Sequence, residues 1–147
     1  PAINQNSTQM AVRYTYGGKQ YYQIYNLANG RFINPRNPVK RICLSATSGD
    51  FQGFDLYGTS IYTIEGSPRK SFLLGYDRSR RYQPTKIRRY NYAVRSKKTI
   101  TVRGAKTLSF REPEGIKVLA GGQIYMMYVS NTLTNQSCNI YRGKRKI

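Results

Sequence analysis

The sequence predicts an all-β fold, a single-domain antiparallel β-sandwich or barrel (jelly-roll-like or simpler) with about ten short strands. Three observations lead to this class. Apolar or aromatic residues alternate with polar ones over strand-length stretches, which is the period of a strand with one buried face. Gly, Pro and Asn-Gly turn signals separate these stretches at intervals of roughly 8 to 12 residues. No window of about 11 residues shows the apolar i, i+3, i+4, i+7 stripe of a helix.

Length and composition favour one packed domain over a disordered basic chain. The chain has 147 residues, of which 39% are hydrophobic and lie along its whole length, so it can bury a real core. We expect a flexible polar arm over residues 1–8, an all-β domain over 9–141 and a basic tail over 142–147.

The best-supported local structure is a three-strand meander at the start of the domain. From Met10 to Tyr16, every second residue is apolar or aromatic, which predicts a strand with one solvated face. Gly17-Gly18 and Asn29-Gly30 are turn signals that separate this strand from the next two. The three expected strands cover 9–16, 20–27 and 31–34.

The middle of the chain predicts a loop and then further short strands. Pro35 and Pro38 each remove a backbone donor, which favours a loop there. The Gly-rich segment 48–58 contains three aromatic residues and predicts an ordered loop or a bulged strand. The expected strands in this region cover 41–46, 60–64 and 71–76, with a turn at 65–68.

Beyond residue 78, the pattern predicts a loop over 78–85 and a strand over 86–95. In that strand Arg88, Tyr90 and Tyr92 share one face, and Ile87 and Arg89 share the other. Two hairpins and a final strand follow. The first pairs 99–102 with 106–110 about Gly104-Ala105, with Ile100, Val102, Leu108 and Phe110 pointing inward. A turn at 112–115 precedes the second, which pairs 116–120 with 123–130, and the last strand covers 138–141.

The most unusual feature is the basic stretch Arg78–Lys98, which contains nine Lys or Arg, three Tyr and no acid. The acid-free interval continues to Arg111, so 34 residues hold 12 of the 25 basic side chains in a chain of net charge +19. Charges this dense repel one another unless an anionic partner meets them. The basic tail adds a second cluster. The expected anion-binding residues are Arg78, Arg80, Arg81, Tyr82, Lys86, Arg88, Arg89, Tyr90, Tyr92, Arg95, Lys97, Lys98, Arg142, Lys144, Arg145 and Lys146.

Tyr90 and Tyr92 allow two interpretations. Tyrosine rings beside guanidinium groups can stack on unpaired bases, as on sheet surfaces that bind single-stranded nucleic acid. Alternatively, the two rings belong to the core and the Arg residues to its rim. The sequence gives the two interpretations equal weight.

Catalytic chemistry has little support in the sequence. The chain has no His, and its six carboxylates are scattered over turn-like sites. Asp50 and Asp55 flank Phe-Gln-Gly-Phe and could hold a divalent cation, but the favoured interpretation is that both are turn residues. We therefore predict that the chain is not an enzyme and that it uses no cofactor, no metal and no small-molecule substrate.

The two cysteines, Cys43 and Cys138, match no metal-ligand spacing. Two buried thiols are the favoured interpretation, and a bridge between the ends of the domain is the alternative. No apolar run approaches the ~18 residues of a spanning helix, and the first 30 residues contain no hydrophobic signal core. We therefore expect synthesis inside the cell and no membrane insertion.

The leading functional hypothesis is a non-enzymatic structural or assembly protein, a virion component such as a minor capsid, cement or coat subunit. Its basic Tyr-rich surface would pack against acidic neighbouring subunits or packaged nucleic acid. The basis is an analogy of fold class and composition, since small β-sandwich proteins of this kind are common in virus particles. This hypothesis expects the terminal arms to become ordered only in the assembly. The alternative is a dedicated nucleic-acid-binding protein of ribosomal or packaging type, cytoplasmic or nuclear, in which Arg and Lys contact phosphates.

Overall fold

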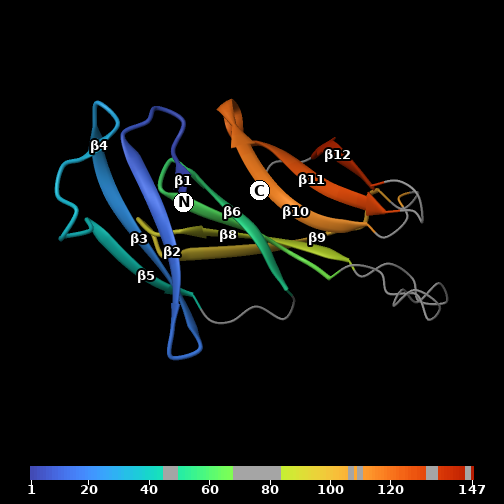
Figure 1. The fold of residues 1–147 in the computed structure, drawn as a ribbon, viewed down its shortest axis with the longest axis horizontal. Coiled ribbons are helices and arrows are strands. Elements are labelled where there is room, and N and C mark those ends of the chain that lie inside the picture. The colour runs from blue at the N-terminus through green and yellow to red at the C-terminus, as the bar shows by residue number, and fades with distance from the viewer. Residues whose placement is uncertain (45–49, 68–83, 106–107, 109–110, 132–135, 145–146) are drawn as a thin grey trace.

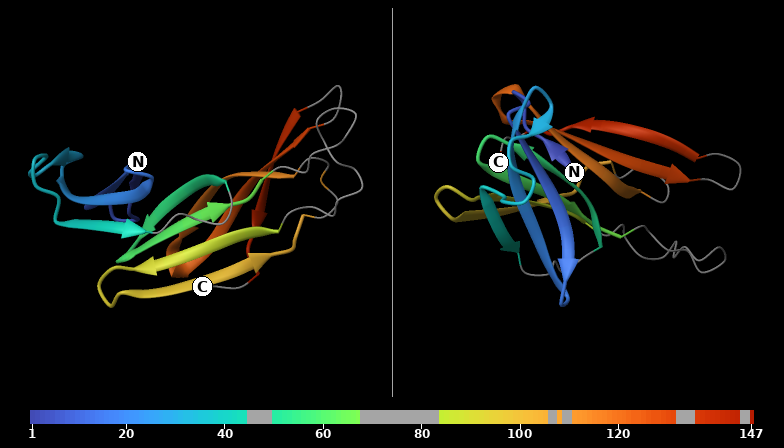
Figure 2. Two further views of the ribbon diagram at one scale, coloured as in Figure 1. Left: turned by 90° about the horizontal axis from the view of Figure 1, so that it is seen from below. Right: turned by 60° about the vertical axis from the view of Figure 1, so that its left-hand side comes forward.

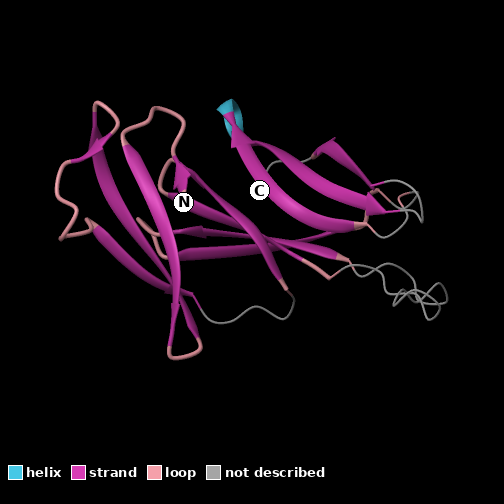
Figure 3. Ribbon diagram, viewed as in Figure 1, coloured by secondary structure: helices cyan, strands magenta, loops and turns pink. Residues whose placement is uncertain are grey.

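The protein is built from three antiparallel β-sheets, which confirms the all-β prediction (Figures 1 and 3). The computed structural model describes residues 1–44, 50–67, 84–105, 108, 111–131, 136–144 and 147. Within these residues the sheets are open and do not close into a barrel. The strands are β1 (Ala2–Ile3), β2 (Gln9–Tyr16), β3 (Lys19–Ala28), β4 (Arg31–Phe32), β5 (Lys40–Leu44), β6 (Phe51–Tyr57), β7 (Ser60–Glu65), β8 (Thr85–Asn91), β9 (Ser96–Val102), β10 (Glu112–Leu119), β11 (Gln123–Asn131) and β12 (Gln136–Arg142).

The first sheet has the strand order β1-β2-β3-β4, with β5 also paired to β3. It contains the predicted meander, with left-handed glycines in both predicted turns. The first eight residues differ from the predicted flexible arm. Strand β1 pairs with β2, Ala2 is buried in the core, and the Asn4 side-chain oxygen accepts hydrogen bonds from the Thr8 and Gln9 amides at 2.9 Å.

The central sheet has the order β6-β7-β8-β9. Strand β6 follows the bulged-strand interpretation of the Gly-rich segment, because its register shifts between Phe51 and Gly53. Every residue of β7 is buried. A strand is buried at all positions when both faces of its sheet are covered, so this sheet is the middle layer.

The third sheet has the order β10-β11-β12, and a short 3-10 turn at Ala120–Gly122 joins β10 to β11 as the second predicted hairpin. One sequence prediction fails nearby. Residues 112–115 are not a turn but the start of β10, which bulges between Pro113 and Gly115. Strand β9 pairs with β8, and of its predicted partner 106–110 only Leu108 is described.

Two hydrophobic cores hold the three sheets together, and Figure 2 shows the ribbon of these sheets from two further sides. The first core lies between the first and central sheets, and the second core lies between the central and third sheets. The buried members of the first core are Ala2, Ala11, Tyr22, Ile24, Ile42, Leu56 and Ile61. Those of the second core are Tyr62, Ile64, Ile87, Val118, Ile124, Met126 and Tyr128, with Ile100, Val102 and Leu108 packed against them as predicted.

A buried carboxylate also connects the central sheet to the third. Asp55 on β6 accepts a hydrogen bond from the Val118 amide at 2.7 Å and from Lys117 Nζ at 3.0 Å. The turn interpretation of Asp55 is therefore wrong. Asp50 does lie in a connection, where its carboxylate accepts a hydrogen bond from the Ser67 hydroxyl at 2.6 Å.

The cysteines agree with neither sequence interpretation. Cys43 and Cys138 are both free and both exposed, on β5 and β12. Among the described residues, no helix is long and apolar enough to span a membrane. The predicted strand over 71–76 falls outside the described residues, as do residues 78–83 of the loop predicted over 78–85. Thr85, the last residue of that predicted loop, already belongs to β8.

Candidate functional site

The candidate site is the β8–β9 hairpin, residues 85–102, here called the basic hairpin. It is the described part of the basic stretch and contains six Lys or Arg and no acid. Its turn covers residues 92–95, where the Asn91 side-chain oxygen accepts hydrogen bonds from the Ala93 and Val94 amides and Arg95 has a φ of 54°. A left-handed residue suits the tight connection that the pairing of Asn91 with Ser96 requires.

The predicted alternation along β8 is confirmed. Thr85 and Ile87 are buried, and Ile87 belongs to the second core, so Arg89 also faces the third sheet. Arg88 and Tyr90 occupy the opposite face, toward the first sheet. The cations of the hairpin are thereby divided between two faces of the central sheet.

Arg88 is tied into the fold by a buried acid. Its Nε lies 3.3 Å from Oε1 of Glu65, whose side chain is only 1% exposed, whereas the Arg88 side chain is 31% exposed. The Thr63 hydroxyl donates to the same carboxylate oxygen at 3.1 Å. An ion pair with a buried partner is costly to break from one side, because it leaves an uncompensated charge inside the protein. Arg88 therefore has a structural role.

Arg89 is also engaged, and it brings the basic tail to the hairpin. Its Nε donates to the Ser60 hydroxyl at 3.1 Å, and its Nη1 donates to the Ile147 carbonyl oxygen at 3.1 Å. The guanidinium lies 6.0 Å from the centroid of the Tyr62 ring. Ile147 also packs against the second core, so this residue of the predicted tail lies beside the central sheet.

Tyr90 and Tyr92 belong to the core side, in agreement with one of the two sequence interpretations. Both rings are half-buried and pack against the first core. The Tyr92 hydroxyl donates to the Gln9 side-chain oxygen at 3.1 Å, and burial raises the pKa of Tyr92. Rings held between two sheets offer little surface for base stacking, so the hairpin presents charge to a partner and not aromatic faces.

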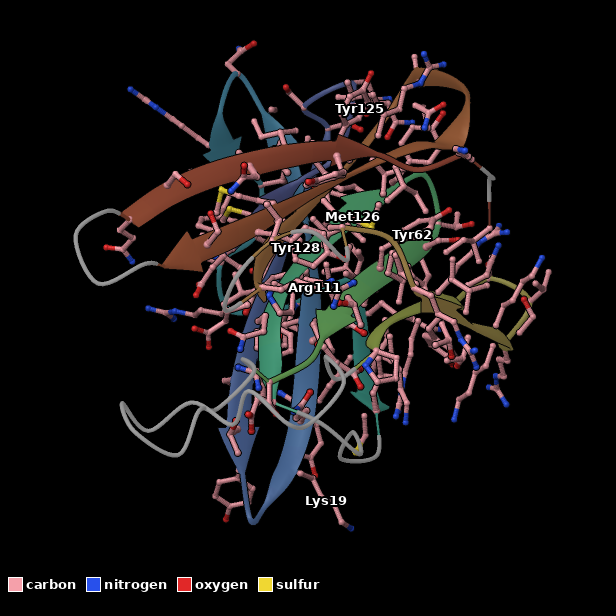
Figure 4. The ribbon with its side chains drawn as sticks, turned by 90° about the vertical axis from the view of Figure 1, so that its right-hand side faces the viewer. Lys19, Tyr62, Arg111, Tyr125, Met126 and Tyr128 are labelled. Atoms are coloured by element: carbon pink, nitrogen blue, oxygen red, sulfur yellow. The ribbon has the colours of Figure 1, made fainter. Side chains whose placement is uncertain are left out.

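Arg111, which closes the acid-free interval, is almost fully buried between the central and third sheets (Figure 4). Its Nε donates to the Gly104 carbonyl at 2.8 Å and its Nη1 to the Thr85 hydroxyl at 3.1 Å. Its guanidinium lies 4.7 Å from the centroid of the Tyr128 ring. Burial raises the pKa of the Tyr128 hydroxyl, against the opposing effects of the Thr85 hydrogen bond and Arg111. This cation belongs to the core.

The cations left for a partner lie on β9 and in the turn. Arg95, Lys97 and Lys98 are exposed, and β9 forms the edge of the central sheet within the described part of the chain. A pocket of about 90 Å³ opens beside them. Its lining residues are Leu44, Arg88, Arg89, Tyr90, Lys97, Lys98 and Thr99. A site of this size and charge suits a single carboxylate or phosphate group.

One pair in the hairpin is electrostatically unfavourable in the free protein. Lys98 lies directly opposite Arg89 in the β8–β9 register. Like charges at directly opposed positions of an antiparallel pair destabilise the sheet by roughly 0.2–1 kcal/mol. A bound anion would remove this repulsion.

The remaining predicted site residues are more dispersed. Lys86 is half-buried on β8, whereas Arg142 on β12 and Lys144 beyond it are exposed. Arg78, Arg80, Arg81, Tyr82, Arg145 and Lys146 fall outside the described residues.

Sequence reasoning missed the residues that complete the pocket and hold its cations. Leu44 lines the pocket from the first sheet, and no sequence pattern connects β5 with β9. Glu65 was placed in a turn because Gly66-Ser67-Pro68 follows it, but it ends the buried strand β7. The only signal was its position after the alternation of 60–64.

Within the described ranges, no group of three His, Cys, Asp or Glu side chains is placed to hold a metal ion. Comparisons with models of protein families, with curated proteins and with solved structures found no match to this chain.

Proposed function

We propose that this chain is a non-enzymatic structural protein of a virus particle, which docks its basic hairpin on an acidic surface of a neighbouring subunit. The observation that carries the proposal is the arrangement of the hairpin. Its exposed charged side chains are all cations, two of its cations face each other directly, and its two tyrosine rings pack against the first core. A surface of this kind gains from meeting carboxylates and has little to offer to stacked bases.

The virus-particle setting rests on fold class and composition. Small β-sandwich domains recur as coat, minor capsid and cement subunits. We expected the terminal arms to become ordered only in the assembly. This expectation finds no support, because β1 is already paired with β2 and Ile147 already packs against the second core. The proposal therefore relies on the hairpin edge and not on the arms.

The test uses a polyglutamate peptide of about 20 residues as the acidic probe, with binding measured by fluorescence anisotropy between ~50 and ~200 mM salt. The variant is Lys98→Glu, and the matched control is Arg31→Glu, an exposed cation of the first sheet. Lys98→Glu places an acid opposite Arg89, so it should stabilise the free protein by roughly 0.2–1 kcal/mol while weakening the peptide complex. Arg31→Glu should change both quantities less.

Two results would contradict the proposal. One is equal loss of peptide binding in both variants, which would mean that only the total charge matters. The other is tight binding of a duplex oligonucleotide by the hairpin. Submicromolar affinity at ~200 mM salt, a steep fall of the logarithm of the binding constant with the logarithm of the salt concentration, and a strong loss of affinity in Lys98→Glu would together show that the hairpin binds phosphates instead.

A further inference from the structure

A second surface lies on the face of the first sheet that points away from the central sheet. Tyr22 and Ile24 on β3 are fully buried in the first core. Alternation along the strand therefore turns Tyr21, Gln23 and Tyr25 to the opposite face. The sequence analysis identified the meander correctly but assigned no role to this face.

Aromatic rings gather on this outer face in two pairs. The rings of Tyr14 and Tyr21 are stacked, with centroids 5.3 Å apart and planes 14° apart. The rings of Tyr25 and Phe32 meet edge to face at 5.1 Å. Tyr14, Tyr21 and Tyr25 are half-buried, Phe32 is 39% exposed, and Tyr16 at the end of β2 is 75% exposed. This set of five rings is called the aromatic face below.

The two ring pairs are spaced along one strand, with polar groups between them. Tyr21 and Tyr25 are four residues apart on β3, which corresponds to about 13 Å along a strand. Gln23 lies between them, and the β3–β5 register places Arg41 directly opposite Gln23. The same register places Cys43 opposite Tyr21. A cation and an amide thus separate two aromatic platforms.

The charge of this part of the chain is entirely positive. Residues 1–49 contain no Asp or Glu, and they contain six Lys or Arg. Two of these, Lys19 and Arg41, lie on the same side of the sheet as the aromatic face. Lys19 pairs directly with Tyr16, and Arg41 pairs directly with Gln23. Such a surface complements a polyanion, and the rings add a preference for one that carries planar groups.

We propose that the aromatic face binds single-stranded nucleic acid. Bases would stack on the Tyr14–Tyr21 and Tyr25–Phe32 pairs, and Arg41 would meet the phosphate between them. Open sheet faces with aromatic rings at alternate positions bind single strands in this way, and stacking is tolerant of sequence because every base has a π-face. This surface is separate from the basic hairpin, so the inference goes beyond the proposed function and does not depend on it.

The test measures the affinity of a fluorescent oligothymidylate of about ten nucleotides by anisotropy at two or more salt concentrations. Tyr14→Thr and Tyr21→Thr remove rings while keeping strand propensity, and each should weaken binding about tenfold or more. Tyr14→Phe and Tyr21→Phe keep the rings and should bind like the parent. Arg41→Gln should lower the salt slope by about one. Circular dichroism of each variant verifies the fold.

Tyr125→Thr is the matched control, because Tyr125 is a half-buried tyrosine on β11 of the third sheet (Figure 4). The inference is overturned if the oligonucleotide does not bind, or if Tyr125→Thr weakens binding as much as the two face variants do. It is also overturned if the face variants weaken polyglutamate binding equally, which would indicate an acidic protein as the occupant. If Lys98→Glu abolishes oligonucleotide binding and the face variants do not, the nucleic acid binds the basic hairpin. That result would overturn both the aromatic-face proposal and the proposed function, whereas failure of the face variants with intact polyglutamate binding to the hairpin would overturn the aromatic-face proposal alone.

Discussion

Replacing Asp55 with Ala should test how the central and third sheets are joined. The Asp55 side chain is buried, with the residue 2% exposed, and its two oxygens accept hydrogen bonds from the Val118 amide and from Lys117 Nζ. Strand β10 pairs with β11 along one edge, and at its other edge the Val118 amide meets the Asp55 carboxylate on β6. Asp55 thus supplies the hydrogen-bond acceptor for the Val118 amide that a neighbouring strand would otherwise supply.

The magnitude follows from what is left behind. Without the carboxylate, the Val118 amide stays buried with no acceptor, which costs about 1–3 kcal/mol. The ion pair contributes less, because the Lys117 side chain is 53% exposed and pairs of that kind are worth about 0–1 kcal/mol. We expect Asp55→Ala to lower the free energy of unfolding by about 2–3 kcal/mol.

The assay is equilibrium unfolding in urea, with the slope against denaturant required to stay constant across the series. Asp55→Asn keeps an oxygen for the Val118 amide and loses the charge, so it should cost less than Asp55→Ala. Lys117→Met removes the partner cation and leaves the buried Asp55 carboxylate with the Val118 amide, so it measures the contribution of the ion pair separately. If Asn and Ala cost the same, the contact with Lys117 and not the amide bond joins the sheets. A loss below about 1 kcal/mol for Ala would refute the reasoning altogether.

Two further predictions concern the two cores. Burial raises the pKa of Tyr22 from 10.0 to about 12, against the opposing effect of Arg13, so the unfolded chain loses this proton first and stability falls as pH rises from 10 toward 12. Tyr22→Phe should flatten that fall by up to about 2–3 kcal/mol, measured as the change in urea midpoint with pH. A Cβ at Gly53 would meet the Gly115 Cα at 3.3 Å, so Gly53→Ala should force β6 and β10 apart and cost about 1–3 kcal/mol. Gly104→Ala, where a Cβ meets open space, should cost much less, and equal melting temperatures for the two variants would contradict the close packing.

Local patterns predicted the strands better than their partners. The alternation from Met10 to Tyr16 and its flanking turns correctly gave the meander, because a two-residue turn forces the adjacent strands to pair. The strand at 99–102 is also present, but its pairing with β8 was not predicted. The turn that joins the two strands, at 92–95, carries no glycine and depends on the Asn91 side chain. Periodicity cannot choose between partners when both neighbours alternate.

The three-layer arrangement was beyond the sequence for a similar reason. A sandwich has two layers, and the run Ser60–Ile64 was predicted as an ordinary strand. Its polar members Ser60 and Thr63 conceal the fact that both of its faces are buried. Glu65 is buried because one further sheet packs on each side of the central sheet, and Arg88 compensates its charge there. The sequence contains no signal for that packing.

For the candidate site, the sequence predicted which face each side chain occupies but not whether that side chain is available. Arg88 and Arg89 are the most prominent pair in the basic stretch, and both are held by contacts within the fold. The exposed cations of the hairpin are instead Arg95, Lys97 and Lys98. Availability depends on what the other two sheets place opposite each cation, and that is tertiary information.

The buried carboxylates sharpen the argument for an anionic partner. The chain has six acids against 25 Lys and Arg, and Asp55 and Glu65 are enclosed, where they face Lys117 and Arg88. Acids committed to the interior cannot screen cations on the surface, so the exposed charge is even more one-sided than the composition indicates. Repulsion among exposed cations destabilises the free chain, and it weakens in salt. Lys98 lies directly opposite Arg89, and the aromatic face lies in a segment without any acid. We therefore expect repulsion between cations at both of the surfaces for which we propose partners.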